Sequence, residues 1–300
     1  MMTLWILTRR NVKLFFKDKG LFFTSLITPL ILLVLYATFL SNVYRDSFAS
    51  GMPEGVIVPE SILDGCVGGM LISSLLSVSC VTVAFCSNML MVQDKVNGSR
   101  GDLTVAPVKS STLSLAYYAA SLISTLLICF VALAAGLCYI ASLGWYLSLA
   151  DVLFMVADVF LLVLFGTALS SVVNFFLSSQ GQISAVGSIV SSCYGFICGA
   201  YMPISSFPLG LQKVVSFLPG TYGTSLFRNH ALRGVFAEME SVGVPKEAVN
   251  ELRGVLDCDL TLLGRDVTLP AMFLILGVTV ALLLGVYILL NTWKNKEKAV

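Results

Sequence analysis

The chain has 300 residues, of which 57% are hydrophobic and 12% charged, whereas a soluble protein is typically about 45–50% apolar and about 25% charged. This composition predicts a polytopic integral membrane protein. The net charge of +1 gives no general attraction for nucleic acid, and a single histidine leaves little for a histidine-based metal or catalytic centre. The eight cysteines are too sparse for a disulfide-stapled secreted domain, and only a bridge between Cys66 and Cys258 is left open.

Residues 1–20 predict an amphipathic helix that lies on the cytoplasmic membrane surface. On a helical wheel the basic side chains share one arc, and most of the apolar ones, Trp5 among them, fill the opposite side. Such a helix buries its apolar face among acyl chains and holds its cations over anionic headgroups. A simple basic flank of the first span is the alternative. The basic residues of the arc are Arg9, Arg10, Lys13 and Lys17.

Six apolar runs have roughly the 20 residues that a membrane-spanning helix needs. Five of them lie within residues 21–202, and the sixth is 269–290. The fold class is therefore all-α integral membrane, with six transmembrane helices. A proline within the first run, Pro29, predicts a kink, and the small residues of the fifth run favour close helix packing. The first five runs are 21–40, 67–91, 113–141, 152–177 and 183–202.

The distribution of Lys and Arg predicts the orientation. Residues 1–20 contain five of them, the second loop three and the tail 291–300 three, whereas the first and third loops together contain only Arg45. Because cytoplasmic loops are enriched in basic residues, both termini are expected in the cytoplasm and segment 203–268 outside, in a multi-pass protein of the plasma membrane.

The second loop, 92–112, does not resemble a passive connector. Two glycines are expected to take positive φ for chain reversal, a proline to end a short helix, and apolar side chains, including Val105, to stay exposed for docking on a cytoplasmic partner. A solvated hairpin is the alternative. The candidate residues of this loop are Asp94, Lys95, Gly98, Arg100, Gly101, Leu103, Pro107 and Val108.

Segment 203–268 is too apolar for an ordinary aqueous loop and too rich in proline for another span. A short pair of re-entrant or interfacial helices satisfies both observations. After it, residues 236–268 have an apolar period, from Val244 to Leu256, that predicts an added external helix.

These motifs together resemble the membrane subunits of ABC-2 type transporters. The second loop matches the family pattern at Asp94, Lys95, Gly98, Leu103, Ala106, Pro107 and Val108, although the charge run before the glycine is weaker than usual. The external segment matches at Pro203 or Pro208, at Leu218 and Pro219, and at Arg228 or Arg233. Segment 236–268 departs from the pattern.

The resemblance implies that the second loop is the coupling helix that docks on an ABC ATPase subunit, which would bind the ATP and Mg²⁺. It also implies a second permease subunit, identical or homologous, and outward transport. Scarce charge favours a lipophilic or amphipathic substrate, such as a drug, peptide or lipid. A polysaccharide or lipid-linked glycan exporter of the same family is the alternative, as is a secondary transporter or channel without ATP coupling.

The chain itself is not expected to be an enzyme. It lacks the Gly-x4-Gly-Lys-Ser/Thr phosphate loop, so ATP hydrolysis is assigned to the partner, and an intramembrane serine hydrolase is excluded because the only histidine, His230, is placed in the outer loop.

Two residues are candidates for the substrate path, Pro29 and Asp158. A carboxylate at the depth of Asp158 costs about 2.5–3.5 kcal/mol, so it is expected to face protein, water or a cation. Contact with a cationic substrate is one hypothesis, and an interhelical hydrogen bond or a protonated acid is the other.

Overall fold

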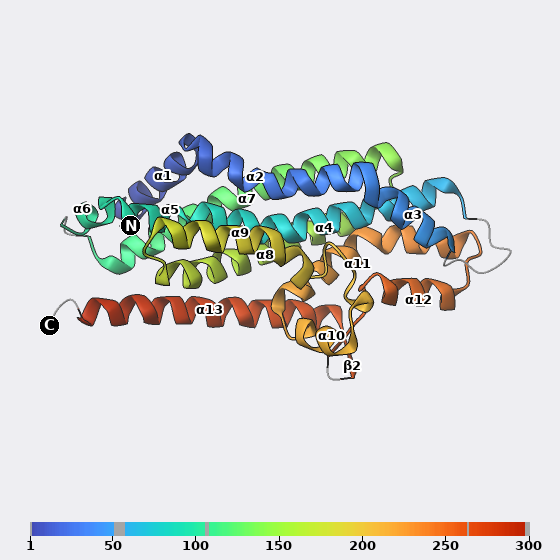
Figure 1. Cartoon of the computed structure of the whole chain (residues 1–300). Helices are drawn as coiled ribbons and strands as arrows, with labels where there is room; N and C mark the ends of the chain where they lie inside the picture. Colours follow the sequence, from blue (N-terminus) through green and yellow to red (C-terminus); the bar gives the residue numbers. More distant parts are fainter. Residues whose placement is uncertain (1, 51–57, 106–107, 263, 298–300) are drawn as a thin grey trace.

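The computed structural model describes residues 2–50, 58–105, 108–262 and 264–297, which form a bundle of long helices (Figure 1). α1, α6 and the end of α13 lie at one end of the bundle, whereas α3 and α12 lie at the other. The helices are α1 (Met2–Lys17), α2 (Lys19–Leu35), η1 (Tyr36–Leu40), α3 (Ser41–Ser50), α4 (Glu60–Asn88), α5 (Leu90–Val96), α6 (Ser99–Val105), α7 (Ser110–Leu143), α8 (Leu149–Phe176), α9 (Gln180–Ile197), η2 (Ile204–Ser206), α10 (Leu209–Ser216), α11 (Pro219–Ser241), α12 (Lys246–Val255) and α13 (Leu269–Glu297).

Five helical segments of the described residues are long and apolar enough to cross a membrane. They correspond to the first four predicted runs and the last. The fifth run forms α9, whose serines and glycines lower its hydropathy, so it is not among the five. This helix ends at Ile197, before the predicted Met202, and Gly199 then turns the chain with a φ of +74°. The five segments are Lys19–Leu40, Glu60–Val96, Ser110–Leu143, Leu149–Phe176 and Leu269–Trp293.

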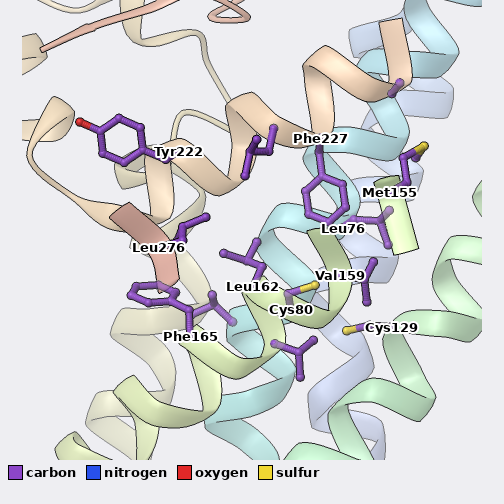
Figure 2. Packing of buried hydrophobic residues seen from close by; sticks show 14 of the residues in the cluster. Leu76, Cys80, Cys129, Met155, Val159, Leu162, Phe165, Tyr222, Phe227 and Leu276 are labelled. Carbon is purple, nitrogen blue, oxygen red and sulfur yellow. The ribbon is translucent and has the colours of Figure 1, made fainter. Parts of the chain in front are cut away.

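α4 is the central helix of the bundle. It packs against α2, α7, α8, α9 and α11, and nearly all of its side chains are buried, which suits a helix that is apolar on every face. Its hydroxyl groups are satisfied locally: Ser77 donates to the Ser73 carbonyl and Ser79 to the Leu75 carbonyl. Side chains from α4, α7, α8, α11 and α13 form the main core, in which Leu76, Val159 and Phe227 lie together (Figure 2).

The segment after α9 contains the predicted re-entrant elements in altered form. Pro203, Pro208 and Pro219 each lie at the start of a helix, where a missing N–H is tolerated. α10 is short, but α11 has 23 residues and is buried over most of its length, so the prediction of two short helices is wrong for the second. α11 also runs to Ser241, so the added helix of 236–268 begins only at Lys246, as α12.

A two-stranded antiparallel hairpin, β1 (Leu260–Leu262) with β2 (Arg265–Val267), follows α12. Strands of three residues are too short to show a period of two in the sequence, so the sequence pattern does not predict this hairpin. The described part of the chain is therefore helical throughout the bundle, with one small β element beside α10.

Candidate functional site

The turn between α5 and α6 depends on Gly98. Its φ of +80° is a left-handed conformation that favours glycine, and its N–H reaches back to the Lys95 carbonyl at 3.4 Å. The second predicted reversal, at Gly101, is wrong: this residue lies inside α6 and is not among the residues with positive φ. Pro107 lies outside the described residues. The turn presents what we call the α5–α6 tip, made of Val96, Asn97, Gly98, Gly101, Asp102 and Val105.

Asp94 anchors this tip to two other helices. Its buried Oδ2 accepts hydrogen bonds from Arg10 Nη1 of α1 at 2.9 Å and from the Tyr117 hydroxyl of α7 at 2.6 Å. Partial burial lowers the pKa of Arg10, but the hydrogen bond and charge of Asp94 outweigh it and raise that pKa above its usual value. Arg10 therefore faces Asp94, and its predicted position over lipid headgroups is wrong.

Lys95 anchors the tip to a third helix. Its Nζ donates to the carbonyls of Asn174, Phe175 and Leu177, at 3.1, 2.9 and 3.2 Å, where α8 ends. A cation at a helix C-terminus satisfies carbonyls that lack an intrahelical partner and complements the helix dipole. Both charges at the start of the predicted coupling motif thus bind within the chain.

Two of the three apolar side chains predicted to be exposed in this loop are not. Leu103 and Val108 are half-buried and pack against a cluster that contains Leu7 of α1 and Tyr117 of α7. Val105 is 89% exposed. Arg100 is half-buried. The surface that α6 leaves exposed is therefore narrower than predicted, and it centres on Asp102 and Val105.

α1 lies against the bundle along one stripe of side chains. Leu7, Thr8, Asn11 and Phe15 are buried, mainly where α1 meets α7. The prediction that the whole apolar side enters lipid is therefore wrong. Trp5 and Phe16 are exposed, as are Arg9, Lys13 and Lys17, so the exposed surface of α1 combines two aromatic rings with three cations.

Two close side-chain contacts join α8 to α11. Asp158 Oδ2 lies 2.6 Å from His230 Nδ1, and Asp151 Oδ1 lies 2.6 Å from Arg233 Nε. The His230 ring also stacks on Phe154, with 5.0 Å between ring centroids. His230 belongs to a buried helix, so its placement in an aqueous outer loop is wrong. This arrangement favours the interhelical hydrogen bond for Asp158 over contact with substrate.

The sequence spacing of the two acids and of the two basic residues could have predicted these contacts between α8 and α11. Two acids seven residues apart on one helix lie on one face, as do two basic residues three apart on another, so the two faces can meet in register.

Arg228 is the centre of a second buried network at the same end. It is fully buried, and it donates to the Leu256 carbonyl at 3.1 Å, to Asp257 Oδ2 at 2.9 Å and to the Gly199 carbonyl at 2.5 Å. Asp257, with a φ of +52°, also accepts from the Ile204 N–H at 2.6 Å. The network therefore joins α11 to the turns after α9 and α12, and Asp257 is a residue that the sequence analysis missed.

Two grooves flank α2. The groove between α2 and α9, of about 500 Å³, combines aliphatic side chains with the hydroxyls of Thr28, Ser188, Ser191 and Ser192. The groove between α2 and α7, of about 570 Å³, is almost wholly apolar. Pro29 lines this second groove, and Asp158 lines neither of them. The helix α2 continues through Pro29 up to Leu35.

Neither a metal site nor a disulfide bridge is found among the described residues. They contain no cluster of three or more His, Cys, Asp or Glu side chains that could hold a metal ion. Cys66 and Cys258 are both free thiols, buried in one hydrophobic cluster, so the bridge left open between them is not formed.

The comparison with protein families agrees with the bundle of long apolar helices described above. A family model described as ABC-2 type transporter matches residues 2–231, from α1 through the α5–α6 tip to the His230 end of the α8–α11 contact. No curated protein gives a significant match. Since the family model covers well over half of the 300 residues, the chain belongs to the ABC-2 type transporter family, as a membrane-spanning permease.

Proposed function

We propose that this permease moves a lipophilic or amphipathic substrate outward, driven by a separate ABC ATPase subunit that docks on the α5–α6 tip and binds ATP and Mg²⁺. The working unit contains a second permease, identical or homologous. It lies in the plasma membrane with both termini in the cytoplasm, and α9 serves as its sixth span. The proposal places the substrate path along the groove between α2 and α9.

The observation that carries the proposal is the attachment of the tip to the bundle. α5 continues the direction of the central helix, since Glu60–Val96 forms one apolar segment. Asp94 then holds α1 and α7, and Lys95 holds the end of α8. A displacement of Val105 by the ATPase would therefore be transmitted to α1, α4, α7 and α8 through short, directional contacts. A passive hairpin would need no such contacts.

The groove between α2 and α9 supports the choice of substrate class. Its lining alternates aliphatic side chains with small hydroxyl groups and contains no charged side chain. Only Phe196 and Tyr201 supply aromatic rings, which is little for the long aromatic track that a polysaccharide would use. An amphipathic molecule finds both apolar surface and hydrogen-bonding groups there.

Co-purification with the cognate ATPase tests the docking surface. The double variant Asp102→Lys, Val105→Asp changes only exposed tip residues, so it is expected to fold and to lose at least tenfold in ATPase binding and in substrate-stimulated ATP hydrolysis. Val242→Asp, also exposed but at the other end of the bundle, is the control. Binding of the tip variant at the wild-type level overturns the proposal.

A second variant separates docking from transmission. Asp94→Asn removes the charge that holds Arg10 while leaving the exposed tip unchanged. The ATPase is expected to bind as tightly as before, and transport per ATP hydrolysed is expected to fall several-fold. Unchanged transport coupling overturns the role of Asp94 in transmission.

A further inference from the structure

The groove between α2 and α7 has a different character from the proposed substrate path. Its floor is α4, and apart from Ser79 and Tyr139 its lining is entirely apolar, without a charged group. It lies on the opposite side of α2 from the hydroxyl-lined groove, because Phe22, Leu26 and Leu33 line this groove and fall on the helix face opposite to Ile27, Ile31 and Leu35, which line the other. A substrate carried along α9 therefore does not occupy it.

The groove has the length of one lipid monolayer. On α7 its lining runs from Leu127 to Tyr139, which at about 1.5 Å per residue is roughly 18 Å. The hydrocarbon of one leaflet is about 15 Å thick, half of a core of about 30 Å. One extended acyl chain therefore fits along the groove.

The cytoplasmic end of the groove is bordered by cations. Phe16 and Phe22 line it where α1 meets α2. Lys13 lies three residues before Phe16, and Lys19 lies three residues before Phe22, so each lysine shares a helix face with a lining phenylalanine.

Lys13, Lys17 and Lys19 are exposed, and within the described part of the chain none of them forms an ion pair or a side-chain hydrogen bond. Asp18, the acid between them, is engaged as the N-cap of α2 and accepts from the Leu21 N–H at 3.1 Å. Asp18 offsets one of the three lysine charges, so the mouth of this apolar groove keeps a net positive charge and matches a molecule with an acyl tail and an anionic head.

We propose that this groove is a binding site for an anionic phospholipid, with one acyl chain between α2 and α7 and the headgroup phosphate over Lys13, Lys17 and Lys19. The lipid is a ligand of the permease and not its transported substrate. A helix of a second copy would also cover the apolar surface, but it would leave three adjacent cations unpaired, so the charge favours the lipid.

Native mass spectrometry of the full chain in detergent tests the site, with phosphatidylglycerol and phosphatidylcholine as the probes. The wild type is expected to bind phosphatidylglycerol at least tenfold more tightly than phosphatidylcholine. Ala135→Trp fills the groove and is expected to reduce binding of both lipids at least tenfold. Ala134→Trp, exposed on the same helix but outside the lining, is the matched control.

The triple variant Lys13→Gln, Lys17→Gln, Lys19→Gln is expected to abolish the preference for phosphatidylglycerol while weak binding of both lipids remains. Replacing Lys109, Lys294 and Lys296 by Gln removes the same charge elsewhere and is expected to retain the preference. Equal binding of the two lipids by the wild type overturns the proposal. So does an Ala135→Trp variant that keeps its lipid but loses self-association, since the occupant would then be a second copy.

Discussion

Two groups of polar contacts hold the bundle, one nearer α12 and one nearer α1, which the proposed orientation makes the outer and the cytoplasmic end. At the outer end, Asp158, His230, Arg228 and Asp257 are all buried, whereas Arg233, which pairs with the buried Asp151, is half-exposed. At the cytoplasmic end, a third of the Arg10 side chain is exposed and Lys95 is only half-buried. Buried pairs lose several kcal/mol when one partner is removed, whereas exposed pairs contribute about 0–1 kcal/mol.

This difference indicates which end can rearrange. Separating the outer contacts would leave charges in an apolar environment, so α8, α11 and the turns around Arg228 move as one body. Arg10 and Lys95 are partly exposed and can exchange their contacts for water more easily, so α1 and the α5–α6 tip can shift against the bundle at a smaller cost. The permease thus has a rigid outer part and an adjustable cytoplasmic part.

The largest effect is expected for Arg228→Met. This change leaves Asp257 buried without its cation and frees the Gly199 and Leu256 carbonyls, so it should lower the free energy of unfolding by about 3–5 kcal/mol. The measurement is thermal unfolding of the purified chain in detergent, with Arg265→Met in the exposed strand β2 as the control. A variant that unfolds at the wild-type temperature would show that the outer part is not held by this network.

A smaller loss is expected for Asp158→Asn. An amide still bonds to His230, but the charge assistance disappears, which should reduce stability by about 1–3 kcal/mol. Transport of a substrate panel, cationic compounds included, is expected to keep its selectivity.

A double-mutant cycle with His230→Gln isolates this contact. If Asp158→Asn costs as much in the His230→Gln background as in the wild type, the two residues are not coupled, and the interhelical explanation of Asp158 fails. Selective loss of cationic substrates in the single variant would restore the substrate-contact hypothesis.

At the cytoplasmic end, Lys95→Met should affect stability little and transport more. The carbonyls that Lys95 binds can turn to water, so we expect a loss of about 0.5–1.5 kcal/mol in stability. Transport per ATP hydrolysed should fall several-fold, because Lys95 no longer links the tip to α8 by hydrogen bonds. Lys109→Met, an exposed change nearby, serves as the comparison, and equal transport by both variants would contradict the assignment.

The smallest expected effect concerns the reactivity of the buried Cys258 thiol, and its measurement requires no change in the fold. Burial raises the pKa of the Cys258 thiol to about 12, so at pH 8 only about one thiol in ten thousand is ionised. Alkylation of Cys258 by N-ethylmaleimide, followed by mass spectrometry, should be at least a hundredfold slower in the native chain than in denaturant. Rapid labelling of the native chain would show that water enters the outer part.

The sequence identified the polar residues of the cytoplasmic site better than it identified their partners. Asp94 and Lys95 were recognised from their place in a loop motif, but they were assigned to an external partner. Their contacts lie far away along the chain: Asp94 bonds to Arg10 across 84 positions, and Lys95 bonds to the Leu177 carbonyl across 82. No local pattern encodes such pairs, because they depend on how helices are placed side by side.

At the other site the sequence predicts Asp158 and Arg228 as candidates but not their partners, for a related reason. His230, Arg228 and Asp257 occur in a segment of mixed polarity, which fits neither an ordinary aqueous loop nor a membrane span and so does not predict their burial. They are buried because α11 packs against α4, α8 and α13, where His230 meets Asp158 of α8 and Arg228 meets Asp257. The packing of α11 decides whether each of these charges is exposed or buried, and this packing cannot be predicted from the hydropathy of the segment.

The amino-acid sequence by itself determined that this is a helical membrane protein, where its long apolar helices run, and which loop carries the family motif. These properties depend on composition and on short-range spacing, because a bilayer requires long apolar helices whatever their arrangement. Only the tertiary structure decided that the motif charges bind inside the chain, that Asp158 pairs with His230, and that one groove beside α2 is apolar and the other lined with hydroxyls. Those properties arise where helices distant in sequence meet, and tertiary packing determines which helices become neighbours.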